Sequence, residues 1–173
     1  MLPNPLHPAI VHFPIALVVL LPFFAIGALW AIHRGASARR TWLIPTAVAA
    51  ALTVSAFVAL RTGQAQGEKV ERVVPERVVD GHEEAAERFL ILSGVLLLVA
   101  GTGLVGGVVG RSARLVSTVG AVALVAAGVQ VGTSGGEMVY KHGAVSVYAG
   151  APGAGAAAQG PAAAAPGRAA DDD

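Results

Sequence analysis

Four long runs without a charged side chain are the feature that most constrains how this chain folds. The runs cover residues 9–32, 41–60, 89–110 and 115 to about 131. A helix needs about 20 mostly apolar residues to cross the hydrocarbon core of a bilayer. Of the 173 residues, 54% are hydrophobic and only 13% are charged, whereas a soluble domain has about 25% charged residues. The sequence therefore predicts an all-α membrane protein, an up-and-down bundle of four helices with spans at about 8–32, 41–60, 82–110 and 115–131.

The segments that connect these runs differ in charge, and this difference assigns them to the two sides of the membrane. Residues 33–40 carry three arginines and no acidic residue, and residues 111–114 (RSAR) carry two arginines and no acidic residue. The longer connection, residues 61–88, mixes five basic with seven acidic residues. By the positive-inside rule the two arginine-bearing connections face the cytoplasm. We therefore expect both termini on the outer side, which is the periplasm for a bacterial inner-membrane protein.

The boundaries of the folded domain follow from local patterns. No Lys or Arg precedes the first run, which also exceeds the roughly 7–15 apolar residues of a signal peptide, so we expect this helix to be retained. Asp80 followed by Glu83 is the pattern of a helix N-cap, and predicts that the third helix begins near Gly81. Residues 148–173 are rich in Ala, Gly and Pro. Such a composition predicts a flexible tail after a domain of residues 1–147.

Glycines in the second half of the third run have the spacing of close helix contacts. Small residues four positions apart allow two helix backbones to approach in a membrane. This spacing predicts packing inside the bundle and contacts that could hold an oligomer together. The pairs are Gly103 with Gly107 and Gly106 with Gly110.

Three of the five histidines are predicted to lie at one height, near the outer ends of helices. His7 is 27 residues from Arg34 and His82 is 29 residues from Arg111, which places them roughly 40 Å and 43 Å above these arginines at 1.5 Å per residue. His142 reaches a similar height if its helix continues that far. His33, in contrast, belongs to the cytoplasmic connection.

His12 is expected about a turn and a half below the other three outer histidines. Pro14 removes the amide that would bond to Ile10, which predicts a kink beside this residue. A polar imidazole in an apolar span should face the bundle and not lipid. His12 is therefore predicted to lie beneath the outer histidine layer, inside the bundle.

Three segments together resemble a known family. The opening LHPAIVHFPIAL, the middle TGQAQGEKVERVV followed by GHEEAAE, and the closing GGEMVYKHGAVSV are similar to a bacterial four-helix membrane family, domain of unknown function 2231. The resemblance covers about residues 6–147. It implies a bacterial inner-membrane protein without an established activity, and, because relatives can be joined to c-type cytochrome modules, a redox partner. The matching motif positions are His7, Pro8, His12, Pro14, His82, Glu83, Gly136, Tyr140, His142 and Gly143.

The first functional hypothesis is a cofactor or pH-sensitive site formed by the outer histidines. A b-type haem needs two neutral imidazoles at similar height on different helices, which any pair among His7, His82 and His142 provides, with His12 beneath. Met138 is an alternative axial ligand. A transition metal such as zinc or copper would instead use the three imidazoles with Glu83 or Glu137. In either case Glu83 is the group predicted to orient an imidazole.

Other hypotheses stay open beside the cofactor site. The chain could be a non-catalytic structural or assembly subunit that docks onto a respiratory or redox complex in the lipid bilayer. Transport is disfavoured because no Asp, Glu, Lys or Arg interrupts a span. We predict no catalytic residue, since neither GxSxG nor HExxH is present. The absence of cysteine excludes thiolate metal sites and covalently attached c-type haem. The net charge of +1 is too small for the basic surface that binds nucleic acid.

Overall fold

A computed structural model describes residues 7–144 of the chain. The predicted tail, residues 148–173, lies outside this described part. Residues 7–144 contain helices and turns but no strand. The helices are α1 (His7–Ile10), α2 (His12–His33), α3 (Ala38–Val70), α4 (Glu76–Thr102) and α5 (Gly107–Tyr140).

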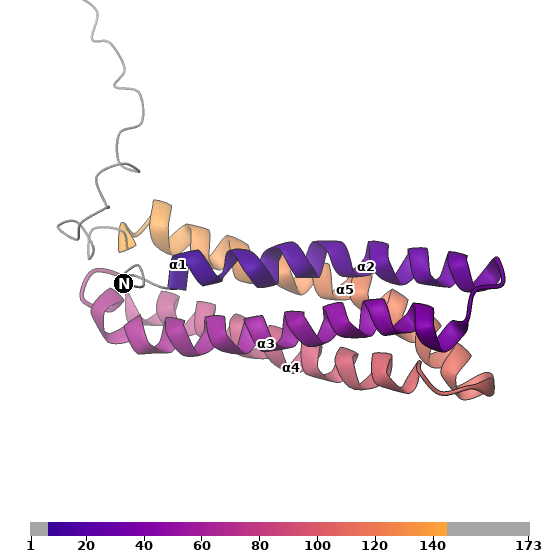
Figure 1. Ribbon diagram of the computed structural model, residues 1–173. Helices are drawn as coiled ribbons and strands as arrows, with labels where there is room; N and C mark the ends of the chain where they lie inside the picture. The colour runs from indigo at the N-terminus through magenta and orange to yellow at the C-terminus, as the bar shows by residue number, and fades with distance from the viewer. Residues whose placement is uncertain (1–6, 145–173) are drawn as a thin grey trace, which may run out of the picture.

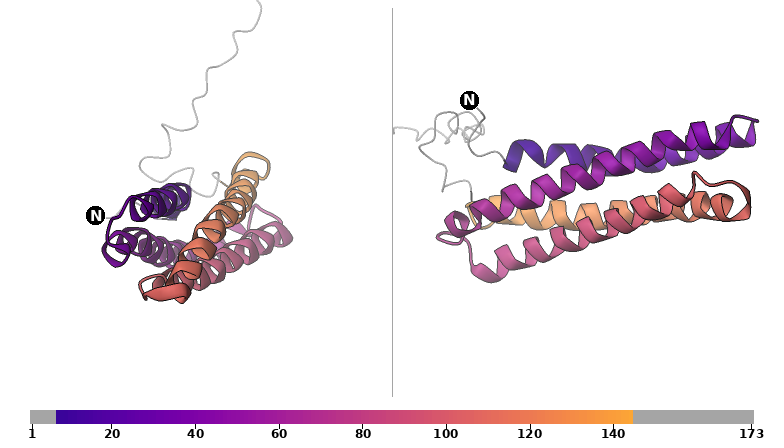
Figure 2. Two further views of the ribbon diagram at one scale, coloured as in Figure 1. Left: turned by 90° about the vertical axis from the view of Figure 1, so that its right-hand side faces the viewer. Right: turned by 60° about the horizontal axis from the view of Figure 1, so that its bottom comes forward.

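The four long helices run antiparallel to their chain neighbours and form one bundle (Figures 1 and 2). Helix α2 packs against α3 and α5, and α4 packs against the same two helices. Helices α2 and α4 are therefore diagonal to each other, as are α3 and α5. All four helices are long and apolar enough to cross a membrane. The predicted fold class, an all-α membrane protein with four spanning helices, is confirmed.

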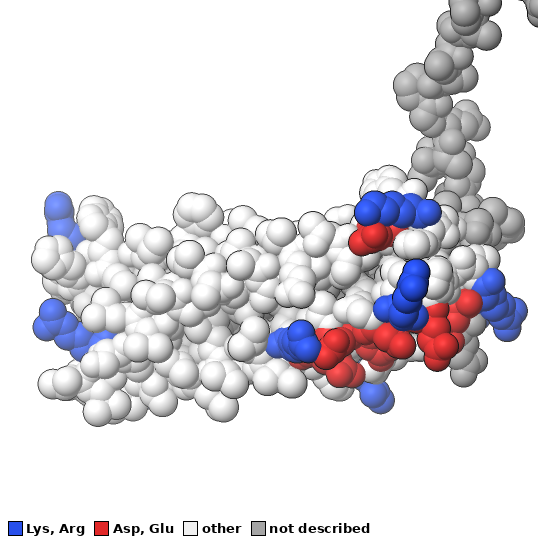
Figure 3. All heavy atoms as spheres, turned by 180° about the vertical axis from the view of Figure 1, so that it is seen from behind, with Lys and Arg blue, Asp and Glu red and all other residues white. Residues whose placement is uncertain are grey.

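Charged side chains are confined to the two ends of the bundle, and the two ends differ (Figure 3). We call the end with the α2–α3 and α4–α5 turns the arginine end, because its charged residues are all arginines: Arg34, Arg39, Arg40, Arg111 and Arg114. We call the opposite end the histidine end. It carries His7, His82 and His142 together with acidic and basic residues around the α3–α4 connection. The uncharged band between the ends is the part that a bilayer would cover.

The interruption between α1 and α2 lies where Pro14 was expected to disturb the helix. Only Val11 separates the two helices, and Pro14 has no amide hydrogen to donate to Ile10. The amide of Val11 still bonds to the carbonyl of His7 at 3.1 Å, and Val11 keeps helical angles of φ −60° and ψ −22°. The proline therefore removes a hydrogen bond without reversing the path of the chain.

The third spanning helix begins earlier than the sequence pattern predicted. It starts at Glu76, directly after Pro75, and Asp80 lies inside the helix instead of capping it. Proline fixes its own φ and cannot continue a preceding helix, so it marks this boundary more strongly than the Asp80–Glu83 pair. Helix α3 likewise continues past its uncharged run to Val70. Both helices project beyond the apolar band, and their outer turns form the histidine end.

The connection between the third and fourth spans also differs from the prediction. It is the turn at residues 103–106, and both arginines of the RSAR segment lie within α5. Gly107 has a φ of +73°, a left-handed conformation that favours glycine. A Cβ atom at Gly103 would overlap the indole of Trp42, and one at Gly110 would overlap the Val105 carbonyl. These glycines therefore serve a tight turn, and the two GxxxG pairs do not lie together on the third span.

The two helical hairpins, α2–α3 and α4–α5, share one packing register. Gly35 and Gly107 both have positive φ, +97° and +73°, and stand seventy-two residues apart in the two arginine-end turns. Rotating the bundle by half a turn about its long axis would exchange α2 with α4 and α3 with α5, which agrees with the contacts between helices. A residue of α2 corresponds to the residue seventy-five positions later in α4, and a residue of α3 corresponds to the residue seventy-two positions later in α5. Equivalent residues are buried in both hairpins: Pro14 and Phe89, Leu21 and Leu96, Ala25 and Ala100, Ala49 and Ala121, and Leu52 and Leu124.

Candidate functional site

His7 is held by α3 through one of its two ring nitrogens. Its Nδ1 lies 2.9 Å from the carbonyl oxygen of Ala59 and 3.4 Å from the hydroxyl oxygen of Thr62. A carbonyl oxygen can only accept a hydrogen bond, so Nδ1 carries the hydrogen and donates it. In the neutral ring, Nε2 then keeps its lone pair. The His7 imidazole is therefore fixed in the tautomer that offers Nε2 as a ligand.

His82 is held by α5 in the same way. Its Nδ1 lies 2.8 Å from the hydroxyl oxygen of Ser134, and that hydroxyl donates to the carbonyl of Val131 at 3.0 Å. One arrangement satisfies both contacts: the hydroxyl donates to Val131, and its oxygen accepts from His82 Nδ1. The Val131 carbonyl also faces the imidazole. In this arrangement His82 is the same tautomer as His7, with a lone pair on Nε2.

Each imidazole also lies against a glycine of the helix that holds it. A Cβ atom added to Gly63 would come within 3.0 Å of Cε1 of His7, and one added to Gly135 would come within 3.1 Å of Cε1 of His82. The glycine thus leaves room for the ring edge. The two supports are equivalent in the hairpin repeat: Ala59, Thr62 and Gly63 on α3 correspond to Val131, Ser134 and Gly135 on α5.

The two histidines come from diagonal corners of the bundle and interact across it. His7 lies on α1, which continues into α2, while His82 lies on α4. They are close enough for a charge on His7 to act on His82. Within residues 7–144 neither Nε2 atom has a hydrogen-bond partner. The histidine end therefore holds two half-buried imidazoles whose free lone pairs belong to equivalent positions of the two hairpins.

The environment of His7 favours its neutral form. Burial lowers the pKa of His7 below its ordinary value of 6.5, and the hydrogen bond to the Ala59 carbonyl opposes this effect only partly. A charged imidazolium loses hydration when it is buried, which is why the neutral ring is preferred. At neutral pH this ring is available as a ligand without first losing a proton.

Comparison with known proteins identifies the family of the chain. The profile of a family described as predicted membrane protein, DUF2231, matches residues 3–147. The chain belongs to the DUF2231 family. The match spans both hairpins and all the histidines discussed above. No curated protein and no solved structure matches the chain.

Two of the predicted site histidines of this DUF2231 chain do not join the His7–His82 pair. His12 is exposed on the outer surface of α2, so the expectation that it faces the bundle is wrong. The residue that faces inward in that turn is Pro14, which is buried. His142 is half-buried in the turn after α5 and lies near Glu137, which is itself bonded to Lys141. The position of His12 around the helix axis of α2 therefore separates it from the pair. His142 is separated because α5 ends before it.

The arrangement offers two ligands and not the three or four of a preformed metal site. Among the described residues, no group of three or more His, Cys, Asp or Glu side chains could hold a metal ion. The set of His7, His82, His142 and Glu83 is therefore not assembled. The group that orients the His82 ring is Ser134, whereas Glu83 acts only as a neighbouring charge.

Sequence reasoning missed the residues that support the two rings. The signal that could have found them is the internal repeat, because a Thr–Gly pair at residues 62–63 recurs as a Ser–Gly pair at residues 134–135. His7 lies against Ala59 and Thr62, and His82 lies against the equivalent residues, Val131 and Ser134. The repeat is hard to see in the sequence, because most equivalent positions have different residues that share only size and burial.

Proposed function

We propose that the histidine end of the bundle binds one b-type haem, and that His7 and His82 are the two residues that would hold its iron. The single observation that carries this proposal is that both rings use Nδ1 for their hydrogen bond to the neighbouring helix, an arrangement that leaves Nε2 as the ligand atom. Metal-binding histidines commonly donate their second nitrogen to a carbonyl or another acceptor, which fixes the ring and raises its basicity. Helix bundles also build cofactor sites from side chains on facing helices.

The number of ligands favours haem over a bare metal ion. Haem iron takes four bonds from the porphyrin and needs only two from the protein, which is the number that the repeat supplies. A structural zinc site needs four protein ligands and a catalytic zinc site three. His142 and Glu83 would have to move to complete such a set, which makes zinc or copper the weaker choice.

The proposal includes a redox role at the outer face of a bacterial inner membrane. The arginine end would face the cytoplasm by the positive-inside rule, and the histidine end with both termini would then face the periplasm. A haem at that face could exchange electrons with a c-type cytochrome or a larger respiratory complex. In support, the half-buried pair lies at the edge of the apolar band, where an electron partner in water can approach.

The test is an absorption spectrum of the full chain, purified from membranes of cells supplied with a haem precursor. We expect a Soret band of a low-spin haem in the wild type, its loss in His7→Ala and His82→Ala, and its retention in His12→Ala and His33→Ala. Circular dichroism of each variant checks that the helices persist. A wild type without a Soret band, even after haem is added, or an unchanged spectrum in His82→Ala, contradicts the proposal.

A second candidate is a non-catalytic structural or assembly subunit. It is favoured by the same two hydrogen bonds, because His7 joins α1 to α3 and His82 joins α4 to α5. In that case the two alanine variants lower the thermal stability of a protein that never shows a Soret band. The spectrum and the melting curve together separate the two candidates.

A further inference from the structure

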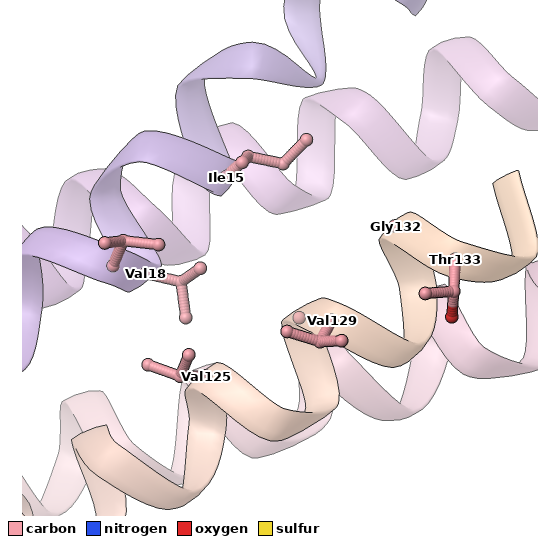
Figure 4. A pocket seen from close by; sticks show the side chains of 8 residues that line it. Ile15, Val18, Val125, Val129, Gly132 and Thr133 are labelled. Carbon is pink, nitrogen blue, oxygen red and sulfur yellow. The ribbon is translucent and has the colours of Figure 1, made fainter. Parts of the chain in front are cut away.

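The seam between α2 and α5 contains a groove that the hairpin repeat does not account for. Two adjoining hollows, about 290 Å³ and 560 Å³, lie along this seam and share Val19 and Val125. Their walls are almost entirely apolar. The upper hollow, which is the smaller one and lies toward the histidine end, ends at Gly132 and Thr133 (Figure 4). The groove opens on the outer surface of the bundle, within the uncharged band.

The groove arises from a difference between the two copies of the hairpin. The half-turn that relates the hairpins exchanges the α2–α5 seam with the α3–α4 seam. At the position equivalent to Gly132, the α3–α4 seam has Leu60, and at the position equivalent to Gly128 it has Ala56. A Cβ atom at Gly132 would meet nothing within 4 Å, whereas one at Gly128 would lie 3.2 Å from Val18. Gly128 thus allows α2 to approach, and Gly132 leaves open the space that a leucine takes in the other seam.

The position of the groove limits what can occupy it. On α2 it runs from Ile26 to Ile15, which is about 16 Å at 1.5 Å per residue, or half of a hydrocarbon core of about 30 Å. No charged residue lines either hollow. The groove therefore suits a molecule of the bilayer that has an apolar part of about this length and an uncharged head.

We propose that this groove binds a quinol, with its isoprenoid chain along the α2–α5 seam and its ring at the level of Thr133. Two observations favour a quinol over a phospholipid: no charged residue lines the groove, and the polar side chain at its upper end is Thr133. The Thr133 hydroxyl donates to the Gln130 carbonyl at 3.0 Å, so its oxygen is left as an acceptor for a quinol hydroxyl. The choice of a redox-active occupant rests on the proposed haem site.

The experiment measures binding of a decyl-tailed benzoquinol and its oxidised form to the full chain in nanodiscs of neutral phosphatidylcholine. Gly132→Leu places in the groove the residue that the other seam carries. Gly27→Leu is the matched control, because Gly27 lies outside the groove and a Cβ there also meets nothing within 4 Å. We expect saturable binding of one quinol per chain, tighter than the quinone, weakened about tenfold or more by Gly132→Leu, and within about twofold of wild type in Gly27→Leu.

Several results overturn the proposal. Two of them are the absence of saturable quinol binding and an unchanged affinity in Gly132→Leu. The third is a wild-type dimer that Gly132→Leu dissociates, because the groove would then be a contact between two copies of the chain. The absorption spectrum of each variant, recorded in parallel, separates this inference from the haem site. Loss of the Soret band with retained quinol binding removes only the haem, and a retained Soret band without quinol binding removes only the quinol.

Discussion

The Nδ1 atom of His82 lies 2.8 Å from the hydroxyl oxygen of Ser134, and the two residues are 52 positions apart. His7 is held in a similar way, with its Nδ1 2.9 Å from the Ala59 carbonyl oxygen and 3.4 Å from the Thr62 hydroxyl oxygen. The two rings occupy equivalent places in the two hairpins, where Thr62 corresponds to Ser134 and Ala59 corresponds to Val131, whose carbonyl faces His82. The two rings reach the histidine end from different sides of the bundle, one from α1 and the other from α4.

Ser134→Ala is predicted to weaken haem binding more than Thr62→Ala does. Ser134 accepts the principal hydrogen bond of His82, whereas His7 keeps its shorter bond to the Ala59 carbonyl when Thr62 is removed. Loss of such a supporting group costs about 10-fold to 100-fold in affinity at metal sites. Haem titrations of both variants measure the difference, and Ser134→Thr, which keeps the hydroxyl, should restore binding. Equal effects in the two alanine variants would argue against the assigned roles.

Gly63→Ala and Gly135→Ala are predicted to displace the two imidazoles. Each new methyl would lie about 3.0–3.1 Å from Cε1 of the adjacent ring, closer than most real contacts. At Gly27 the same substitution meets open space, and alanine is the better helix former by about 1 kcal/mol. We therefore expect Gly27→Ala to raise the melting temperature slightly and the two site variants to lower haem affinity. The measurements are thermal melts and haem titrations, and unchanged affinity at both site glycines would contradict the described fit.

Acidification is predicted to destabilise the folded protein through His7. Burial lowers the pKa of His7 below 6.5, so its contribution to stability is complete above this pH and is lost as the pH falls below it. His82 faces His7 from α4 and adds repulsion when both rings are protonated. Thermal melts between pH 8 and pH 5 should show a steeper loss in wild type than in His7→Gln, which does not titrate. Parallel curves would show that His7 does not set the pH dependence.

Trp42→Phe is predicted to destabilise the arginine end of the bundle. The Trp42 indole is fully buried and donates from Nε1 to the Ala100 carbonyl at 3.0 Å, which joins α3 to α4. The Ala100 carbonyl still accepts from the Gly103 amide and the Thr46 hydroxyl, so the expected cost is that of one hydrogen bond, about 0.5–1.5 kcal/mol, together with the packing that the smaller ring loses. Trp30→Phe is the control, because Trp30 is 63% exposed. Denaturant unfolding in detergent should separate the two variants, and equal stabilities would refute the role of the Trp42 bond.

Much of the fold could be predicted from the sequence because a bilayer leaves few alternatives. Uncharged runs of the right length must form helices, and their charged connections lie at the ends. The boundaries were less predictable. Pro75 and the left-handed Gly107 decided two of them, while the Asp80–Glu83 pattern and the RSAR segment pointed to positions inside helices.

The candidate site could be predicted only in part. The helical rise brought His7 and His82 to one end of the bundle, and the structure places them as an interacting pair. Rotation about the helix axis was harder to infer, and His12 faces outward as a result. The acceptors of the two rings lie on other helices. One of them is a backbone carbonyl, which cannot be inferred from the type of residue at that position.

The most direct test of this account is a titration of the purified, haem-free chain with haem b, followed by absorption and electron paramagnetic resonance. If His7 and His82 share one haem, the titration breaks at one haem per chain and the product is low-spin with two imidazole ligands. His7→Met and His82→Met should each change that spectrum to the same extent, because the two positions are equivalent. A break at two haems per chain, no saturable binding, or a change in only one of the two variants would contradict the shared site.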